Sequence, residues 1–248
     1  MPSPVAYAVL CLAISATAAA QTPQTPWRGE NLQYFPKDIA RPELIQRMRE
    51  FSFALGVRCQ YCHAGGNGIS FEGVSFPSDE KPAKIQARAM LRMVDQLNTT
   101  TLAQLPSHAQ PRVTIDCATC HHGLPLPKSL QTTLLEIIDK DGAPAAVTRY
   151  RELRADMALG RYNFGEWEMN ELARRLTAAG KTDAAIAMLE VNGEFNPKSA
   201  DIDLLIGDLY RQQGEREKAA ERYKRALEKA PESAAAKQRL AELEKKPQ

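Results

Sequence analysis

The sequence has few cysteines outside two short motifs, no second long apolar run and no strong charge of either sign. Of five cysteines in 248 residues, only Cys11 lies outside the pattern Cys-x-x-Cys-His, and it falls in the apolar N-terminal segment. The 32 lysines and arginines are interspersed with 30 aspartates and glutamates, so nothing favours nucleic acid as a partner. Beyond the first 20 residues, no apolar stretch is long enough to cross a membrane.

The N-terminal segment is mostly apolar and ends in small residues, Ala18, Ala19 and Ala20. This pattern predicts a secretory signal peptide at residues 1–20, followed by a flexible lead-in at residues 21–29. A lipid anchor on Cys11 is disfavoured, because the bulky Leu10 precedes it where a small residue is needed. We therefore expect an exported protein, located in the periplasm or on the outer face of the inner membrane.

The remaining four cysteines form two copies of Cys-x-x-Cys-His, made of Cys59, Cys62 and His63, and of Cys117, Cys120 and His121. Two thiols at this spacing can add across the vinyl groups of a porphyrin, and the adjacent imidazole can then bind the iron. We predict two covalently attached haem c groups, with both histidines as proximal iron ligands. A four-cysteine zinc site would leave both histidines without a role, and neighbouring cysteine pairs rarely serve as structural disulfides.

A helix that begins near Pro42 and ends at Gly56 is expected before the first motif. Met48 falls on its apolar face, and the chain reverses just before Cys59. That reversal would bring Met48 alongside the first haem, opposite His63, as the sixth iron ligand. The alternative is that Met48 only packs in the core, which is the usual role of a methionine on an apolar stripe.

A second helix is expected before the second motif, with Met90 and Met93 both able to face the porphyrin. His108, in the connection that follows, is the spare imidazole, either an exposed loop residue or a distal ligand. Position alone leaves the second sixth ligand open between these three residues. His122 is expected on the surface or beside a propionate. The candidates to neutralise the propionates are Arg47, Arg49, Arg58, Arg88, Arg92 and Arg112.

Residues 30–127 resemble the cytochrome c subunit of photosynthetic reaction centres. The resemblance lies in Leu32-Gln-Tyr-Phe-Pro-Lys-Asp38, Leu55-Gly-Val-Arg-Cys-Gln-Tyr-Cys-His63, Ala87-Arg-Ala-Met90-Leu-Arg-Met93 and Cys117-Ala-Thr-Cys-His-His-Gly123. That family is built from helix, turn and CxxCH units, in which most haems take a methionine from the preceding helix. The resemblance implies Met48 for the first haem and favours Met90 for the second, while His108 occupies a place comparable to a histidine ligand of one family haem.

The family subunit carries four haems, whereas this chain has two motifs and resembles one half of it. The resemblance implies redox protein partners, among them a membrane photosynthetic reaction centre or another membrane redox complex. A role in photosynthesis follows from this resemblance only.

The C-terminal part of the chain repeats itself at the 34-residue period typical of tetratricopeptide repeats. The recurring positions are Gly180, Ala185 and Pro197, which return as Gly214, Ala219 and Pro231. The first copy is imperfect, because Asn192 stands where the second copy has Ala226. We expect residues 128–165 to be a linker with a degenerate helical half-repeat, and residues 166–248 to be repeats closed by a capping helix.

The expected fold class is therefore mainly α, with a helix-turn-CxxCH multihaem cytochrome domain at residues 30–127 followed by tetratricopeptide-like repeats. A haem with histidine and methionine ligands has no open coordination site. We accordingly expect a one-electron carrier rather than an enzyme, with repeats that dock a protein. The competing classes are a dihaem enzyme such as a peroxidase, and a haem-based redox or gas sensor that signals through the repeats. The enzyme would need an iron without a strong sixth ligand and a distal acid–base group.

Overall fold

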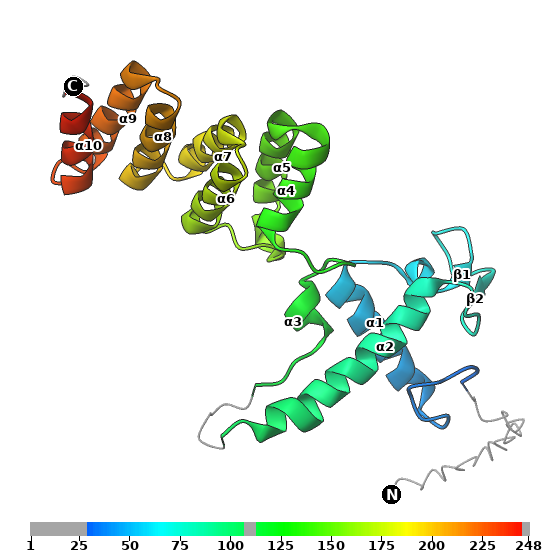
Figure 1. Ribbon diagram of the computed structural model, residues 1–248. Helices are drawn as coiled ribbons and strands as arrows, with labels where there is room; N and C mark the ends of the chain where they lie inside the picture. Colours follow the sequence, from blue (N-terminus) through cyan, green and yellow to red (C-terminus); the bar gives the residue numbers. More distant parts are fainter. Residues whose placement is uncertain (1–28, 107–112, 245–248) are drawn as a thin grey trace, which may run out of the picture.

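The computed structural model of the protein describes residues 29–106 and 113–244 and is mainly helical, which confirms the expected fold class (Figure 1). The signal peptide prediction and His108 lie outside the described residues. Within the described residues, the structure contains ten α-helices and one two-stranded antiparallel sheet. None of the helices described is both long enough and apolar enough to cross a membrane.

Residues 29–127, which we call the motif region, contain three of these helices and the small sheet. The elements are α1 (Arg41–Leu55), β1 (Ala64–Gly65), β2 (Val74–Ser75), α2 (Pro82–Gln96) and α3 (Cys117–His121). Proline in the first turn helps to start both α1 and α2. Gly56 ends α1 in the left-handed conformation, with φ of 64°, as the sequence predicts.

The segment before α1 is held against α2 by side-chain hydrogen bonds. The hydroxyl of Tyr34 donates to Asp95 Oδ2 at 2.6 Å, and Arg88 donates to the carbonyl oxygen of Asn31 at 3.0 Å. Burial, together with the bond to Asp95, raises the pKa of Tyr34 to about 12. Tyr34 therefore stays a neutral donor near pH 7.

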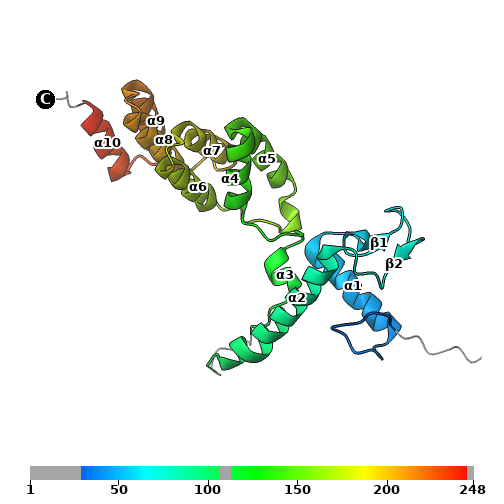
Figure 2. The ribbon, with the colours of Figure 1, turned by 45° about the vertical axis from the view of Figure 1, so that its right-hand side comes forward.

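Residues 130–244, which we call the repeat region, form a row of helical pairs to one side of the motif region (Figures 1 and 2). The helices are α4 (Leu130–Asp141), α5 (Ala143–Ala155), α6 (Glu166–Ala178), α7 (Thr182–Phe195), α8 (Ala200–Gln212), α9 (Arg216–Lys229) and α10 (Ala234–Glu244). Helices α4 and α5 pack together, as do α6 with α7 and α8 with α9, and α10 packs on α9. Residues 128–165 thus contain two packed helices.

The packed apolar core lies almost wholly in the repeat region. One buried cluster runs from Leu130 to Leu209, and a second runs from Leu204 to Leu243. Asn192 is fully buried among these side chains, but its Nδ2 donates to the Glu166 carbonyl oxygen and to Asn170 Oδ1, each at 3.0 Å. The buried amide group of Asn192 therefore has hydrogen-bond partners, so this departure from the repeat pattern leaves no unpaired polar group at Nδ2.

Helices α8 and α9 approach closely where Gly207 faces Tyr223. A Cβ atom on Gly207 would lie 2.4 Å from Tyr223 Cε1, and the ring is fully buried with its hydroxyl donating to Asp208 at 2.8 Å. Because the ring cannot move aside, we expect overpacking by the added methyl group of Gly207→Ala to cost about 1–3 kcal/mol of the free energy of unfolding. This loss should exceed the gain in helix propensity of about 1 kcal/mol.

Urea unfolding followed by circular dichroism measures this effect, with Gly193→Ala as the matched control. Gly193 is also helical, but a Cβ there would meet Ile202 at an ordinary 3.7 Å. Equal stabilities of the two variants would contradict the close approach at Gly207.

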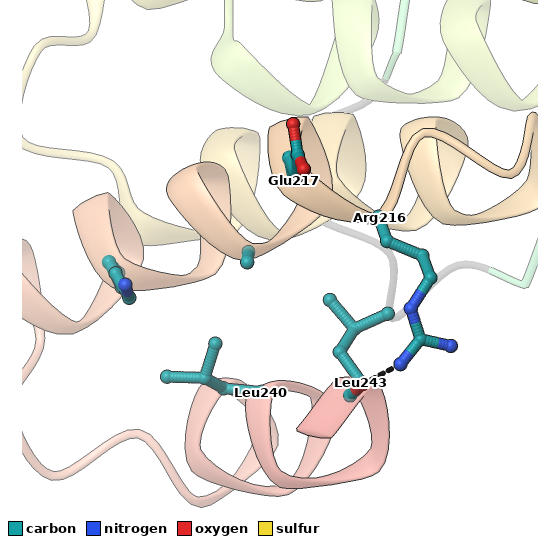
Figure 3. A pocket seen from close by; sticks show the side chains of 6 residues that line it. Arg216, Glu217, Leu240 and Leu243 are labelled. Carbon is teal, nitrogen blue, oxygen red and sulfur yellow. Dashed lines mark hydrogen bonds between the residues drawn. The ribbon is translucent and has the colours of Figure 1, made fainter. Parts of the chain in front are cut away.

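The end of the row has a pocket of about 270 Å³ between α9 and α10 (Figure 3). It is lined by Arg216, Glu217, Ala220, Lys224, Leu240 and Leu243. Arg216 donates a hydrogen bond to the carbonyl oxygen of Leu243, which ties the end of α10 to the start of α9. None of the residues that line this pocket belongs to the cysteine motifs.

Candidate haem sites

The first motif is wound into a single turn. The N–H groups of Cys62 and His63 both donate to the carbonyl oxygen of Cys59, at 3.2 and 3.0 Å. The ring of His63 lies against the ring of Phe76, with a centroid distance of 5.1 Å, and its Nδ1 is 3.1 Å from the Phe76 carbonyl oxygen. The loop after β2 therefore orients the imidazole of the first motif.

The second motif is the short helix α3, which Asp116 caps. Asp116 accepts a hydrogen bond from the backbone N–H of Thr119 at 2.8 Å, and hydrogen bonds with Thr119 lower the pKa of its carboxyl group. His121 Nδ1 is 2.7 Å from the carbonyl oxygen of Leu124. His122 is exposed and ends the helix with φ of 48°.

The two histidines that follow the cysteine pairs share one arrangement. A carbonyl oxygen only accepts hydrogen bonds, so each Nδ1 must carry the proton that it donates, to Phe76 in one case and to Leu124 in the other. Nε2 then keeps its lone pair, as an iron ligand requires. Burial also lowers the pKa of His63, which favours its neutral form.

The motif region exposes apolar side chains that a porphyrin would cover. Among its described residues only Ile39, Ala54, Ala64 and Arg88 are buried. The exposed large apolar side chains near the motifs and on the two preceding helices include Ile45, Phe53, Tyr61, Phe71, Phe76, Ile85, Met90 and Met93. A region of this size without a packed interior needs a further apolar group to form one, and the residues present therefore fit a haem at each motif.

In the described part of the chain, the cysteines are arranged neither as disulfides nor as a zinc site. All four motif cysteines are free thiols. Among the residues that the structure describes, no three His, Cys, Asp or Glu side chains are grouped so that they could hold a metal ion. Among these described residues, the two cysteine pairs are therefore not brought together as a four-cysteine zinc site would require.

The end of α1 joins the two motifs. Helix α1 packs against α3, and the N–H of Gly123 donates to the carbonyl oxygen of Ala54 at 2.9 Å. A Cβ atom on Gly56 would lie 2.2 Å from the carbonyl oxygen of Gly123. Only glycine at position 56 allows this approach.

The distal ligands stay predictions. Met48 is half-buried on α1, while Met90 and Met93 on α2 are 47% and 43% exposed, so exposure does not choose between the last two. His108 lies outside the described residues.

One of the arginines expected to neutralise a propionate has another role, and two charged residues near the motifs were not expected from the sequence. Arg88 is buried and pairs with Asp79 at 2.9 Å, so it holds the segment before α1. Arg112 lies outside the described residues. Sequence reasoning missed Lys84, which reaches the Phe76 carbonyl oxygen at 2.7 Å. It also missed Arg161, whose Nε lies 3.7 Å from the position of a Cβ on Gly123.

Two family models match different parts of the chain, and the first match extends beyond the motif region to include α4 and α5. Residues 59–162 match the family model of the photosynthetic reaction centre cytochrome C subunit, and residues 176–243 match that of the tetratricopeptide repeat. The predicted resemblance is confirmed. A match to this cytochrome family implies covalently bound haem c and supports a cytochrome-like electron carrier.

Cytochrome c-554 of Chloroflexus aurantiacus is 46% identical to the chain over 74 residues. The matched part is 30% of this chain and only 16% of that relative. A solved structure, the first TPR of Spaghetti (RPAP3) bound to an HSP90 peptide, is 16% identical with a TM-score of 0.32, over 46% of this chain and 86% of that one. That score is too low to support an assignment.

Proposed function

We propose that the protein is an exported dihaem c-type cytochrome that passes single electrons between redox proteins, with repeats that dock a protein partner. The observation that carries the proposal is the pair of motifs in which each histidine donates Nδ1–H to a backbone carbonyl and keeps Nε2 for iron. The cytochrome match supports the electron-carrying part, and the repeat match supports a protein partner. The redox partner we propose is a membrane photosynthetic reaction centre or another membrane redox complex.

Each group of residues has a separate task in this proposal. The covalent attachment sites are Cys59, Cys62, Cys117 and Cys120, the proximal ligands are His63 and His121, and the distal ligands are Met48 and Met90. Met93 and His108 are the alternatives for the second distal ligand. A haem with histidine and methionine ligands supplies a one-electron Fe(III)/Fe(II) couple.

The chain itself orients the ligands and limits access to them. The carbonyl oxygens of Phe76 and Leu124 fix the orientation of the two imidazoles. The methionines would occupy the remaining iron positions and keep out substrates and gases. The apolar side chains of α1 and α2 would exclude water from the porphyrin.

Absorption and electron paramagnetic resonance spectra of the exported protein test the carrier function. We expect six-coordinate low-spin iron at both sites in both oxidation states, with neither carbon monoxide nor peroxide binding. High-spin iron that binds either molecule would instead favour the peroxidase or sensor classes.

A further inference from the structure

The carbonyl oxygen of Phe76 accepts two hydrogen bonds from side chains. One comes from His63 Nδ1 at 3.1 Å, and the other from the ammonium group of Lys84 at 2.7 Å. Lys84 is held in this position by a second bond, to the Ser78 carbonyl oxygen at 2.8 Å. In the described part of the chain, no other side chain donates to the Leu124 oxygen that faces His121. The two motifs therefore differ at this contact.

The ammonium group of Lys84 is shielded from water, because its side chain is only 12% exposed. Arg88 lies nearby, and the positive charges of Lys84 and Arg88 help burial to lower the pKa of His63. Asp79 pairs with both cations, at 3.3 Å from Lys84 and 2.9 Å from Arg88. Because the single negative charge of Asp79 is shared by the two positive charges of Lys84 and Arg88, this group of three side chains near His63 carries a net positive charge.

The second motif has a different balance of charge. Asp116 stands directly before Cys117, and its hydrogen bonds with Thr119 keep it ionised. Arg161 places a positive charge beside Gly123 on the other side. No cation among the described residues donates to the carbonyl that faces His121.

The shared oxygen has a chemical consequence for the imidazole. An imidazole that donates Nδ1–H to a strong acceptor becomes more electron-rich, and an electron-rich ligand stabilises ferric iron. Lys84 draws electron density from the Phe76 oxygen and so weakens it as an acceptor. The nearby positive charge also favours an added electron. Both effects raise the reduction potential of the iron that His63 binds.

We propose that Lys84 is a positioning residue that acts through the Phe76 carbonyl and makes the haem on Cys59 and Cys62 the higher-potential haem of the pair. A single electron carried by the protein then resides at the first motif. This inference rests on the proposed dihaem function.

A spectroelectrochemical titration of the exported holoprotein tests the inference. Lys84→Met and Lys84→Gln should each shift the higher of two midpoint potentials downward and leave the lower one unchanged, while Lys84→Arg should retain most of the wild-type value. The variant with Cys117→Ala and Cys120→Ala keeps only the first haem and assigns the potentials.

Lys81→Met is the matched control, because Lys81 is a cation near the start of the same helix that donates to the Gln60 carbonyl oxygen at 2.8 Å instead. Its shift should be smaller than that of Lys84→Met. Equal shifts, or unmoved potentials in chains that hold two low-spin haems, would overturn this inference alone. Absence of haem from the wild type would overturn the proposed function and the inference together.

Discussion

Replacing Met48 by alanine is expected to open one iron and leave the other unchanged. Met48 is half-buried on α1, and alanine has no group that could replace its thioether as an iron ligand. The ferric spectrum should lose one of two methionine-ligand bands, and the reduced protein should bind one carbon monoxide per chain, where the wild type binds none. Carbon monoxide titration with absorption spectra measures both changes.

Met90→Ala should have the same effect on the second iron, and Met93→Ala is its matched control. Both methionines lie on α2 with similar exposure, so a general disturbance of the helix would affect both variants alike. An unchanged Met90→Ala spectrum would assign the ligand to Met93 or His108. Retention of both bands in Met48→Ala would contradict the role of Met48.

Gly56→Ala is expected to weaken the motif region strongly and to reduce haem incorporation at the second motif. Alanine at φ of 64° costs about 1–2 kcal/mol. Its Cβ would also lie 2.2 Å from the Gly123 carbonyl oxygen, and overpacking of this kind costs about 1–3 kcal/mol more. The contact between Gly123 and Ala54, which fixes α3 on α1, should therefore be lost.

Gly160→Ala separates the two causes. Gly160 has nearly the same φ, 65°, but nothing lies within 4 Å of its Cβ position. Thermal unfolding and haem content of the two variants should show a larger loss for Gly56→Ala. Equal losses would mean that only backbone strain matters and that the approach of α1 to the second motif does not.

Local signals in the sequence predicted much of the helical structure. Pro42 and Gly56 mark the ends of α1 because their effects on φ act within the helix itself. The helix α4, which pairs with α5, lies where a linker is expected from the sequence. Leu130, Leu134 and Ile138 nevertheless recur there at helical spacing, and all three are buried. That spacing was available in the sequence.

Long-range contacts at the candidate sites could not be predicted. His63 and Lys84 meet at the Phe76 carbonyl because the loop after β2 folds back on the motif. Gly123 meets Ala54 because α1 and α3 pack together. No local pattern encodes such pairings, since they depend on how separate elements pack. The motif spacing predicted which side chains carry the chemistry, but not what tunes them.

The haem content of the exported chain tests the central claim most directly. Protein produced in a host that matures c-type cytochromes should show, by denatured haem absorbance and by intact mass, two covalently bound haems per chain. A chain without covalent haem, or one that carries zinc on its cysteines, would contradict the account.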